Sequence, residues 1–208
     1  MSHLVLASAS PRRVDLLHQL GLSFEQIVSP VDEPPPTGDP VEHAEHSARL
    51  KALAVIGILP GDLRTEPTHV IGADTVVCVD DTLLGKPSSP QEAHRMLRLL
   101  SGRDHTVCTG LAVADTAGNV QTAAEVTRVF MAPLSDAQIA WYVASGEPLD
   151  KAGSYGIQGL GARFIERIEG CYYNVVGLPL FRLTTLLAAA GFDVDTPPHS
   201  DLSPPDGS

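Results

Sequence analysis

The first 21 residues contain a strand–turn–helix unit that restricts the fold more than any other part of the chain. Leu4–Ala7 is a short apolar run typical of a strand, and Ser8-Ala9-Ser10 is a tight polar turn. Pro11 then begins a helical pattern of apolar residues that stops at Gly21. Ser10 suits the N-cap of this helix, Pro11 its first position and Gly21 the residue just beyond its end.

Two arginines, Arg12 and Arg13, occupy the first turn of this predicted helix. The helix dipole favours anions there by up to about 1 kcal/mol, so two cations are unexpected. An anion held by free backbone N–H groups and both guanidiniums explains them, whereas a surface helix with two solvated arginines is the alternative. We therefore interpret Ser8, Ser10, Arg12 and Arg13 as candidate phosphate-binding residues.

Length, composition and charge limit the class of protein. The 208 residues, 43% of them hydrophobic and 19% charged, suit one α/β domain or two closely joined lobes. The chain shows neither an apolar run of the ~20 residues that a membrane span needs nor a signal-peptide pattern, so we expect a cytoplasmic protein. The net charge of −11 argues against a nucleic-acid-binding surface. Cys78, Cys108 and Cys171 are expected to be reduced core residues.

The order of the predicted elements favours a mixed sheet flanked by helices. Strands are expected at Phe24–Val28, His69–Val79, Leu83–Leu84, His105–Ala114 and Val120–Met131, with a hairpin of Phe164–Ile168 and Tyr172–Val176 around Glu169-Gly170. Helices are expected at Asp39–Ile56 (ended by Gly57), Ser89–Leu100, Ser135–Gly146 and Pro179–Ala190, with a polar loop at Gly61–Thr68. We expect one domain over residues 1–193 and a disordered tail over 194–208, where Thr, Pro, Ser, Asp and Gly dominate.

Asp74 lies within the apolar run Val70–Val77. A carboxylate there is costly to bury unless it is paired, hydrogen-bonded or bound to a metal. A strand that opens into a cleft at Asp74 would supply a general base or a Mg²⁺ ligand, and a structural aspartate bonded to nearby backbone is the alternative. Lys51, on the long helix, and Lys86, in a Gly-Lys-Pro turn, are ambiguous when each is taken alone.

A glycine-rich stretch runs from Asp150 to Gly161. Its four glycines imply close backbone approach or positive φ angles, as in a ligand cleft or in tight surface turns. Gln158 within it could read a nucleobase edge, since an amide offers both a donor and an acceptor. His43 and His46 are three residues apart on the long helix, and we expect them to face solvent.

Several short segments together carry a family pattern. They are Ser8, Ser10, Pro11, Arg12 and Arg13; then Glu33; Lys51; Gly72-Ala73-Asp74-Thr75; Lys86-Pro87; and Ser101, Gly102 and His105. In this order they resemble the Maf family of nucleoside triphosphate pyrophosphatases, and the resemblance extends from about Leu4 to Leu187. The stretch Asp150–Gly159 resembles the family members that act on dTTP and UTP.

The resemblance implies a fold like that of the inosine triphosphate pyrophosphatases, a mixed sheet with two lobes around a central cleft, usually in a homodimer. It implies hydrolysis of a nucleoside triphosphate to the monophosphate and pyrophosphate with a divalent cation, Mg²⁺ or Mn²⁺. By similarity, Asp74 is the proton acceptor, and Arg12, Thr75 and Gln158 are specificity positions.

This chemistry agrees with the residues present. Attack by water at the α-phosphorus needs a base, for which Asp74 is suited, and cations must converge on the phosphate oxygens. Arg12, Arg13, Lys51 and Lys86 are the expected clamp, and Glu33 is expected to help Asp74 hold the metal. Two alternatives stay open: a nucleotide-binding regulator of septum formation without catalysis, and a purine-type nucleotide pyrophosphatase.

Overall fold

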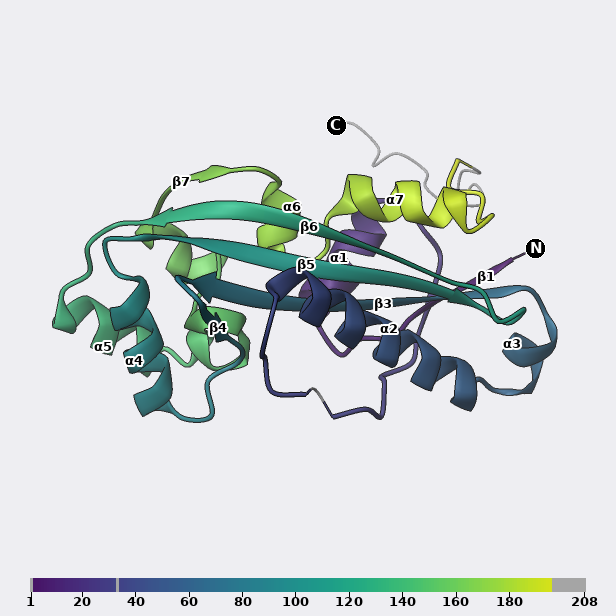
Figure 1. Ribbon diagram of the computed structural model, residues 1–208, viewed down its shortest axis with the longest axis horizontal. Coiled ribbons are helices and arrows are strands. Elements are labelled where there is room, and N and C mark those ends of the chain that lie inside the picture. The colour runs from purple at the N-terminus through teal and green to yellow at the C-terminus, as the bar shows by residue number, and fades with distance from the viewer. Residues whose placement is uncertain (1, 33, 196–208) are drawn as a thin grey trace, which may run out of the picture.

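The computed structural model describes residues 2–32 and 34–195, which form a seven-stranded mixed sheet flanked by helices (Figure 1). The strand order is β2-β1-β3-β5-β6-β7, with β4 paired to β3 beside this path. The strands are β1 (His3–Leu6), β2 (Glu25–Gln26), β3 (Thr68–Val79), β4 (Thr82–Leu84), β5 (Asp104–Asp115), β6 (Val120–Met131) and β7 (Ile165–Glu169). Strand β1 is parallel to β2 and β3, and the other pairs are antiparallel. The predicted mixed sheet is confirmed.

Helices cover both faces of this sheet, with α2 on one face and α7 on the other (Figure 1). The helices are α1 (Pro11–Gln19), α2 (Pro40–Ile58), α3 (Gly61–Thr65), α4 (Pro90–Leu100), α5 (Asp136–Ala144), α6 (Tyr172–Val176) and α7 (Leu180–Ala189). Three 3₁₀ turns are η1 (Glu147–Asp150), η2 (Ala152–Ser154) and η3 (Gly159–Phe164). In the part of the chain that the structure describes, no helix combines the length and apolar character needed to cross a membrane.

The core follows the alternation of side chains along β1. Leu4 and Leu6 pack with α1 and α7 on one face of the sheet, whereas Val5 and Ala7 pack with α2 on the other. A third cluster lies where β3 and β5 run past α4 and α5. Because β1 is hydrophobic on both faces, its carboxyl end and the start of α1 are fixed from two sides.

Two glycines let α2 approach the sheet closely. A Cβ at Gly72 would fall on the Ala48 carbonyl oxygen, and one at Gly110 would fall on the backbone of Ala44. The buried face of α2 is mostly small, with Ala44, Ser47, Ala48 and Ala52 among its members. The backbone of α2 therefore lies directly against the backbone of the sheet. This contact brings Lys51, which is also buried on this face of α2, to the middle of β3.

The predicted hairpin partner Tyr172–Val176 is wrong, because these residues form helix α6. Strand β7 pairs with β6 instead. The side chain of Asn174 is fully buried and donates to the Val107 carbonyl and to Thr127 Oγ1. A buried amide stabilised by partners on β5 and β6 thus overrides the local β propensity of the tyrosines and valines.

Other boundaries differ less from the prediction. Gly57 does not end the long helix, which continues to Ile58, and Gly61–Thr65 within the predicted loop is helix α3. The predicted strand Phe24–Val28 shrinks to two residues. The three cysteines are free, as expected, but of the three only Cys108 is buried, and Cys78 and Cys171 are half-buried. Residues 196–208 of the predicted tail lie outside the described residues.

Gly72→Ala is expected to lower the free energy of unfolding, because the new methyl group must push the Ala48 backbone away from the sheet. Overpacking of this kind costs about 1–3 kcal/mol. Gly57→Ala is the matched control, since it lies in α2 with nothing within 4 Å of the new Cβ. That control should gain stability by about 0.5–1 kcal/mol. Urea denaturation measures both, and equal effects would contradict the close contact.

Candidate active site

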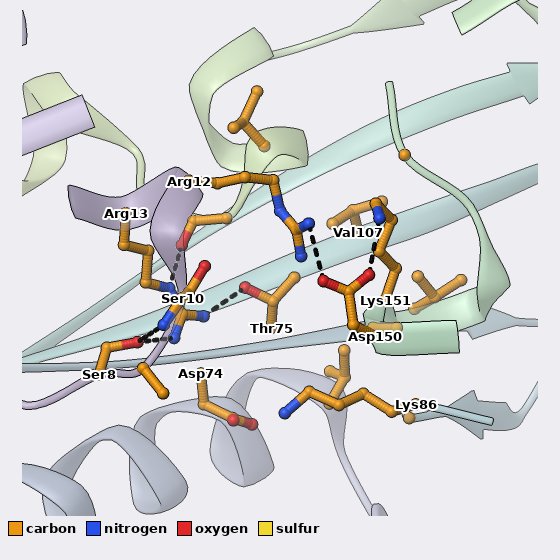
Figure 2. A pocket seen from close by; sticks show the side chains of 18 of the residues that line it. Ser8, Ser10, Arg12, Arg13, Asp74, Thr75, Lys86, Val107, Asp150 and Lys151 are labelled. Carbon is orange, nitrogen blue, oxygen red and sulfur yellow. Dashed lines mark hydrogen bonds and ion pairs between the residues drawn. The ribbon is translucent and has the colours of Figure 1, made fainter. Parts of the chain in front are cut away.

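One cleft of about 390 Å³ gathers nearly all the predicted site residues (Figure 2). Its walls come from the β1–α1 turn, α2, β3, the turn after β4, the glycine-rich stretch and the end of α6. Nine of the predicted residues line it: Ser8, Ser10, Arg12, Arg13, Lys51, Asp74, Thr75, Lys86 and Gln158. The tenth, Glu33, lies outside the described residues. The fold therefore assembles side chains that are up to 150 positions apart, from Ser8 to Gln158.

Asp74 and Lys51 form a buried ion pair in this cleft. Lys51 Nζ lies 2.6 Å from Asp74 Oδ1, and the two residues are 6% and 7% exposed. Lys51 lies between Ala48 and Ala52 on the buried face of α2, so the close approach at Gly72 places it opposite Asp74. Breaking such a pair is strongly destabilising, because one charge is left buried alone. Asp74 is therefore tied to a lysine rather than only to nearby backbone.

Arg13 is bonded mainly to the protein. Its Nε donates to the Gly177 carbonyl at 2.8 Å, and its Nη1 donates to the Ala73 carbonyl at 2.9 Å and to Ser8 Oγ at 3.2 Å. Its Nη2 donates to Thr75 Oγ1 at 3.1 Å. The guanidinium thus holds both neighbours of Asp74 in the chain. Arg13 lines the cleft as predicted, but these bonds favour a positioning role over the predicted phosphate clamp.

Arg12 takes a different direction, toward the glycine-rich side of the cleft (Figure 2). Its Nη1 lies 3.2 Å from Asp150 Oδ2, while Lys151 Nζ lies 2.6 Å from Asp150 Oδ1. Burial tends to raise the pKa of Asp150, but the hydrogen bond from Lys151 and the charges of Arg12 and Lys151 lower it overall. The alternative of two solvated arginines is therefore wrong. Asp150 and Lys151 were missed as site residues, although both lie in the glycine-rich stretch.

The start of α1 keeps polar groups directed at the cleft. Ser10 is the N-cap residue, yet its side chain makes no cap hydrogen bond, and α1 has no acidic residue in its first turn among the described residues. Ser8 Oγ instead accepts from Ser10 N at 3.2 Å. A helix N-terminus with this arrangement is suited to bind an anion.

The glycine-rich stretch forms a wall of the cleft, which decides between its two predicted readings. Gly153, at φ +67°, leaves no room for a Cβ because Val77 lies against it, and its N–H donates to the Gly85 carbonyl at 3.1 Å. This bond joins the stretch to the turn that carries Lys86. Figure 2 shows the Lys86 ammonium directed toward the side of the cleft where Asp74 lies.

A buried histidine supports the same wall. His105 Nε2 lies 2.6 Å from the hydroxyl of Tyr155, and both residues are buried. Burial lowers the pKa of His105 to about 4, against a small opposing effect of Asp104. The imidazole is therefore neutral at physiological pH, so the family motif that contains His105 supplies structure here, not charge.

The carboxylates suit a divalent cation only in part. Among the described residues there is no group of three or more His, Cys, Asp or Glu side chains able to hold a metal ion. Each carboxylate oxygen of Asp150 has an ion pair, with Arg12 or with Lys151, whereas the ion pair of Asp74 with Lys51 uses Oδ1 alone among the described residues. Asp74 is therefore better suited to a cation than Asp150. His46 is exposed, as expected, whereas the expectation for His43 is wrong because it lines the cleft half-buried.

An α/β protein with a cationic cleft at a helix N-terminus, facing a buried carboxylate, is suited to bind a phosphorylated ligand. The chain belongs to the Maf family, whose model, described as "Maf-like protein", matches residues 3–190. It is 53% identical over 196 residues to the dTTP/UTP pyrophosphatase of Pelotomaculum thermopropionicum, covering 93% of this chain and 100% of that protein. It is 49% identical to the dTTP/UTP pyrophosphatase of Symbiobacterium thermophilum, covering 94% and 98%.

Among solved structures, the Staphylococcus aureus Ham1 protein aligns with a TM-score of 0.46 and 16% identity over 79% of this chain and 80% of that chain. A dITP/XTP pyrophosphatase from Mycobacterium abscessus aligns with a TM-score of 0.43 and 14% identity over 91% and 94%.

The protein should lose stability as the pH falls from about 6.5 to about 4, in part because of His105. In that window the unfolded chain binds a proton at His105 that the folded protein excludes, so acid favours unfolding by up to roughly 3 kcal/mol. Urea denaturation at several pH values measures this loss. His105→Gln should reduce it, while His46→Gln, at an exposed position, should not. An unchanged pH dependence in His105→Gln would contradict the buried neutral imidazole.

Proposed function

We propose that the protein hydrolyses dTTP and UTP, with modified pyrimidine nucleotides as further substrates, to the monophosphate and pyrophosphate, a house-cleaning activity. The observation that carries this proposal is the convergence of Asp74, the arginine-bearing start of α1 and Gln158 on one cleft. Relatives named dTTP/UTP pyrophosphatase, at up to 53% identity over nearly the whole chain, support the choice of pyrimidine substrates.

Asp74 is the proposed proton acceptor for the water that attacks the α-phosphorus. Lys51 fixes one oxygen of its carboxylate at 2.6 Å, and Arg13 fixes the residues on both sides of it, through the Ala73 carbonyl and the Thr75 hydroxyl. A base held on a rigid strand in this way needs little reorganisation when the reaction begins.

Lys86 and Arg12, through its guanidinium and its backbone N–H at the start of α1, are the proposed partners of the phosphates. Negative charge grows on the phosphate oxygens and on the leaving pyrophosphate, and fixed cations stabilise it. Arg12 now pairs with Asp150, which is 60% exposed, so a triphosphate can compete for the guanidinium.

A divalent cation, Mg²⁺ or Mn²⁺, is part of this proposal. Mg²⁺ is commonly held by one or two carboxylates together with substrate phosphates, which suits the single carboxylate of Asp74 with Glu33 as its proposed companion. When bound, the ion would neutralise charge on the phosphate oxygens. A cytoplasmic homodimer stays a prediction from the family resemblance.

The alternative of a nucleotide-binding regulator explains the buried pair poorly. Burying two charges costs solvation free energy that their mutual attraction often fails to recover. A buried ion pair is therefore weak evidence that the two residues serve only to stabilise the fold. A binding protein needs the arginines but does not need a carboxylate held at 2.6 Å from a buried lysine. An enzyme needs such a carboxylate, because its catalytic base must be held in a fixed orientation.

A nucleotide panel tests the proposed reaction. The protein incubated with dTTP, UTP, GTP or ATP and Mg²⁺ or Mn²⁺ should release pyrophosphate and the monophosphate, fastest from dTTP and UTP, and chelation of the metal should stop the reaction. Ion chromatography separates pyrophosphate from orthophosphate. Orthophosphate as the first product, or no turnover of any nucleotide, would refute the pyrophosphatase.

Asp74→Asn is expected to lower kcat by about 10² or more, because the amide keeps the shape of the carboxylate but has no basicity. It also leaves the Lys51 ammonium buried without its anion, which costs several kcal/mol, about 3–5 for pairs of this kind. The double variant Asp74→Asn with Lys51→Met should recover stability without recovering activity. Circular dichroism and denaturation measure the first, and pyrophosphate release the second. Activity within a few-fold of wild type in folded Asp74→Asn would show that another group is the base.

A further inference from the structure

Glu147, at the start of η1, is a hydrogen-bond acceptor for four groups of the glycine-rich wall and its support. Its Oε2 accepts from Leu160 N at 2.8 Å, and its Oε1 accepts from Gly161 N at 3.0 Å and from the Tyr142 hydroxyl at 2.8 Å. Its backbone carbonyl accepts from Lys151 Nζ at 2.5 Å. Against the effect of partial burial, these N–H and O–H donors lower the pKa of Glu147.

Tyr142 extends this arrangement to the other side of Gln158. The tyrosine is fully buried on α5, and its hydroxyl accepts from Gly156 N at 3.1 Å. The segment from Gly156 to Gly161 is therefore attached at one end to the Tyr142 hydroxyl and at the other to the Glu147 carboxylate. Gln158 lies between the two attachments.

Close contact adds a second restraint beside Gln158. Gly159 has a φ of +70°, and a Cβ there would meet the carboxylate of Glu147. The side chain of Gln158 is exposed on the cleft wall and makes no hydrogen bond with any residue that the structure describes. Its position thus depends on its backbone, and its amide is available to a ligand.

We propose that Glu147 and Tyr142 are positioning residues for base discrimination: they hold the backbone of Gln158 so that its amide meets the pyrimidine edge of the substrate. This inference rests on the proposed function. The nucleobase is its ligand class, and neither residue is expected to touch the phosphates. Because a site built to hydrogen-bond its substrate discriminates only while its polar groups stay in place, loosening this backbone should reduce the preference for pyrimidines.

Glu147→Gln is the first test variant, since its amide NH₂ would face N–H donors that need an acceptor. Tyr142→Phe is the second, because it removes only the hydroxyl that joins Glu147 to Gly156. Glu166→Gln is the matched control, being an exposed glutamate on β7. Hydrogen–deuterium exchange of residues 156–161 and the kinetics with dTTP, UTP and GTP are measured for all three and for wild type.

Faster exchange over residues 156–161 is expected in both test variants and not in the control. The value of kcat/KM for dTTP and UTP should fall about tenfold, mainly through KM, while that for GTP changes less than threefold, so that discrimination narrows. Equal losses for all three nucleotides, or unchanged exchange, would overturn the proposal. If wild type turns over no nucleotide, the proposed function fails. The positioning role is then tested by equilibrium binding of dTTP and GTP to wild type and the variants, where the ratio of the two dissociation constants should narrow in both test variants and not in the control.

Discussion

The site depends on how closely α2 lies against the sheet. Gly72 and Gly110 leave no side chain between β3, β5 and the helix, so backbone meets backbone. That contact brings Lys51 to 2.6 Å from Asp74 in a nearly closed environment. With even one methyl group between the layers, the lysine would withdraw from the strand and leave a buried carboxylate without its partner. The ion pair of Asp74 with Lys51 thus depends on the lack of side chains at Gly72 and Gly110.

Arg12 and Arg13, adjacent in α1, contact different parts of the site because successive residues of a helix point in different directions. Arg13 points into the protein and binds the carbonyl of Ala73 and the hydroxyl of Thr75, which fixes the strand around the proposed base. Arg12 points across the cleft to Asp150, in a more exposed ion pair. The Arg13 guanidinium therefore shapes the site, and the Arg12 guanidinium is the one proposed to exchange its carboxylate partner for a phosphate.

Short sequence patterns correctly predicted those elements whose formation depends on neighbouring residues. The helix starts at Asp39, Ser89 and Ser135 and the long apolar strand around Asp74 follow from short-range preferences and are confirmed in the structure. Two local predictions are wrong in detail, because the Ser10 side chain makes no cap hydrogen bond and Gly57 does not end α2. The gathering of the site residues in one cleft was predicted through the family resemblance. Helix α6 was missed because the buried bonds of Asn174, on which it depends, involve residues 47 and 67 positions away. Nothing local to Tyr172–Val176 indicates those partners.

Glu147 and Tyr142 were missed for a related reason. A glutamate followed by a proline reads as an ordinary helix start, and a tyrosine at a buried helical position reads as core. Only the folded chain brings the carboxylate to two backbone N–H groups beyond Gln158 and the hydroxyl to one before it. The four glycines of the glycine-rich stretch predicted a close backbone contact, but the sequence did not indicate which residues would make it. The proposed base-reading side of the cleft is therefore organised by acceptors that hold backbone N–H groups, whereas the proposed catalytic side is organised by cations that hold a strand.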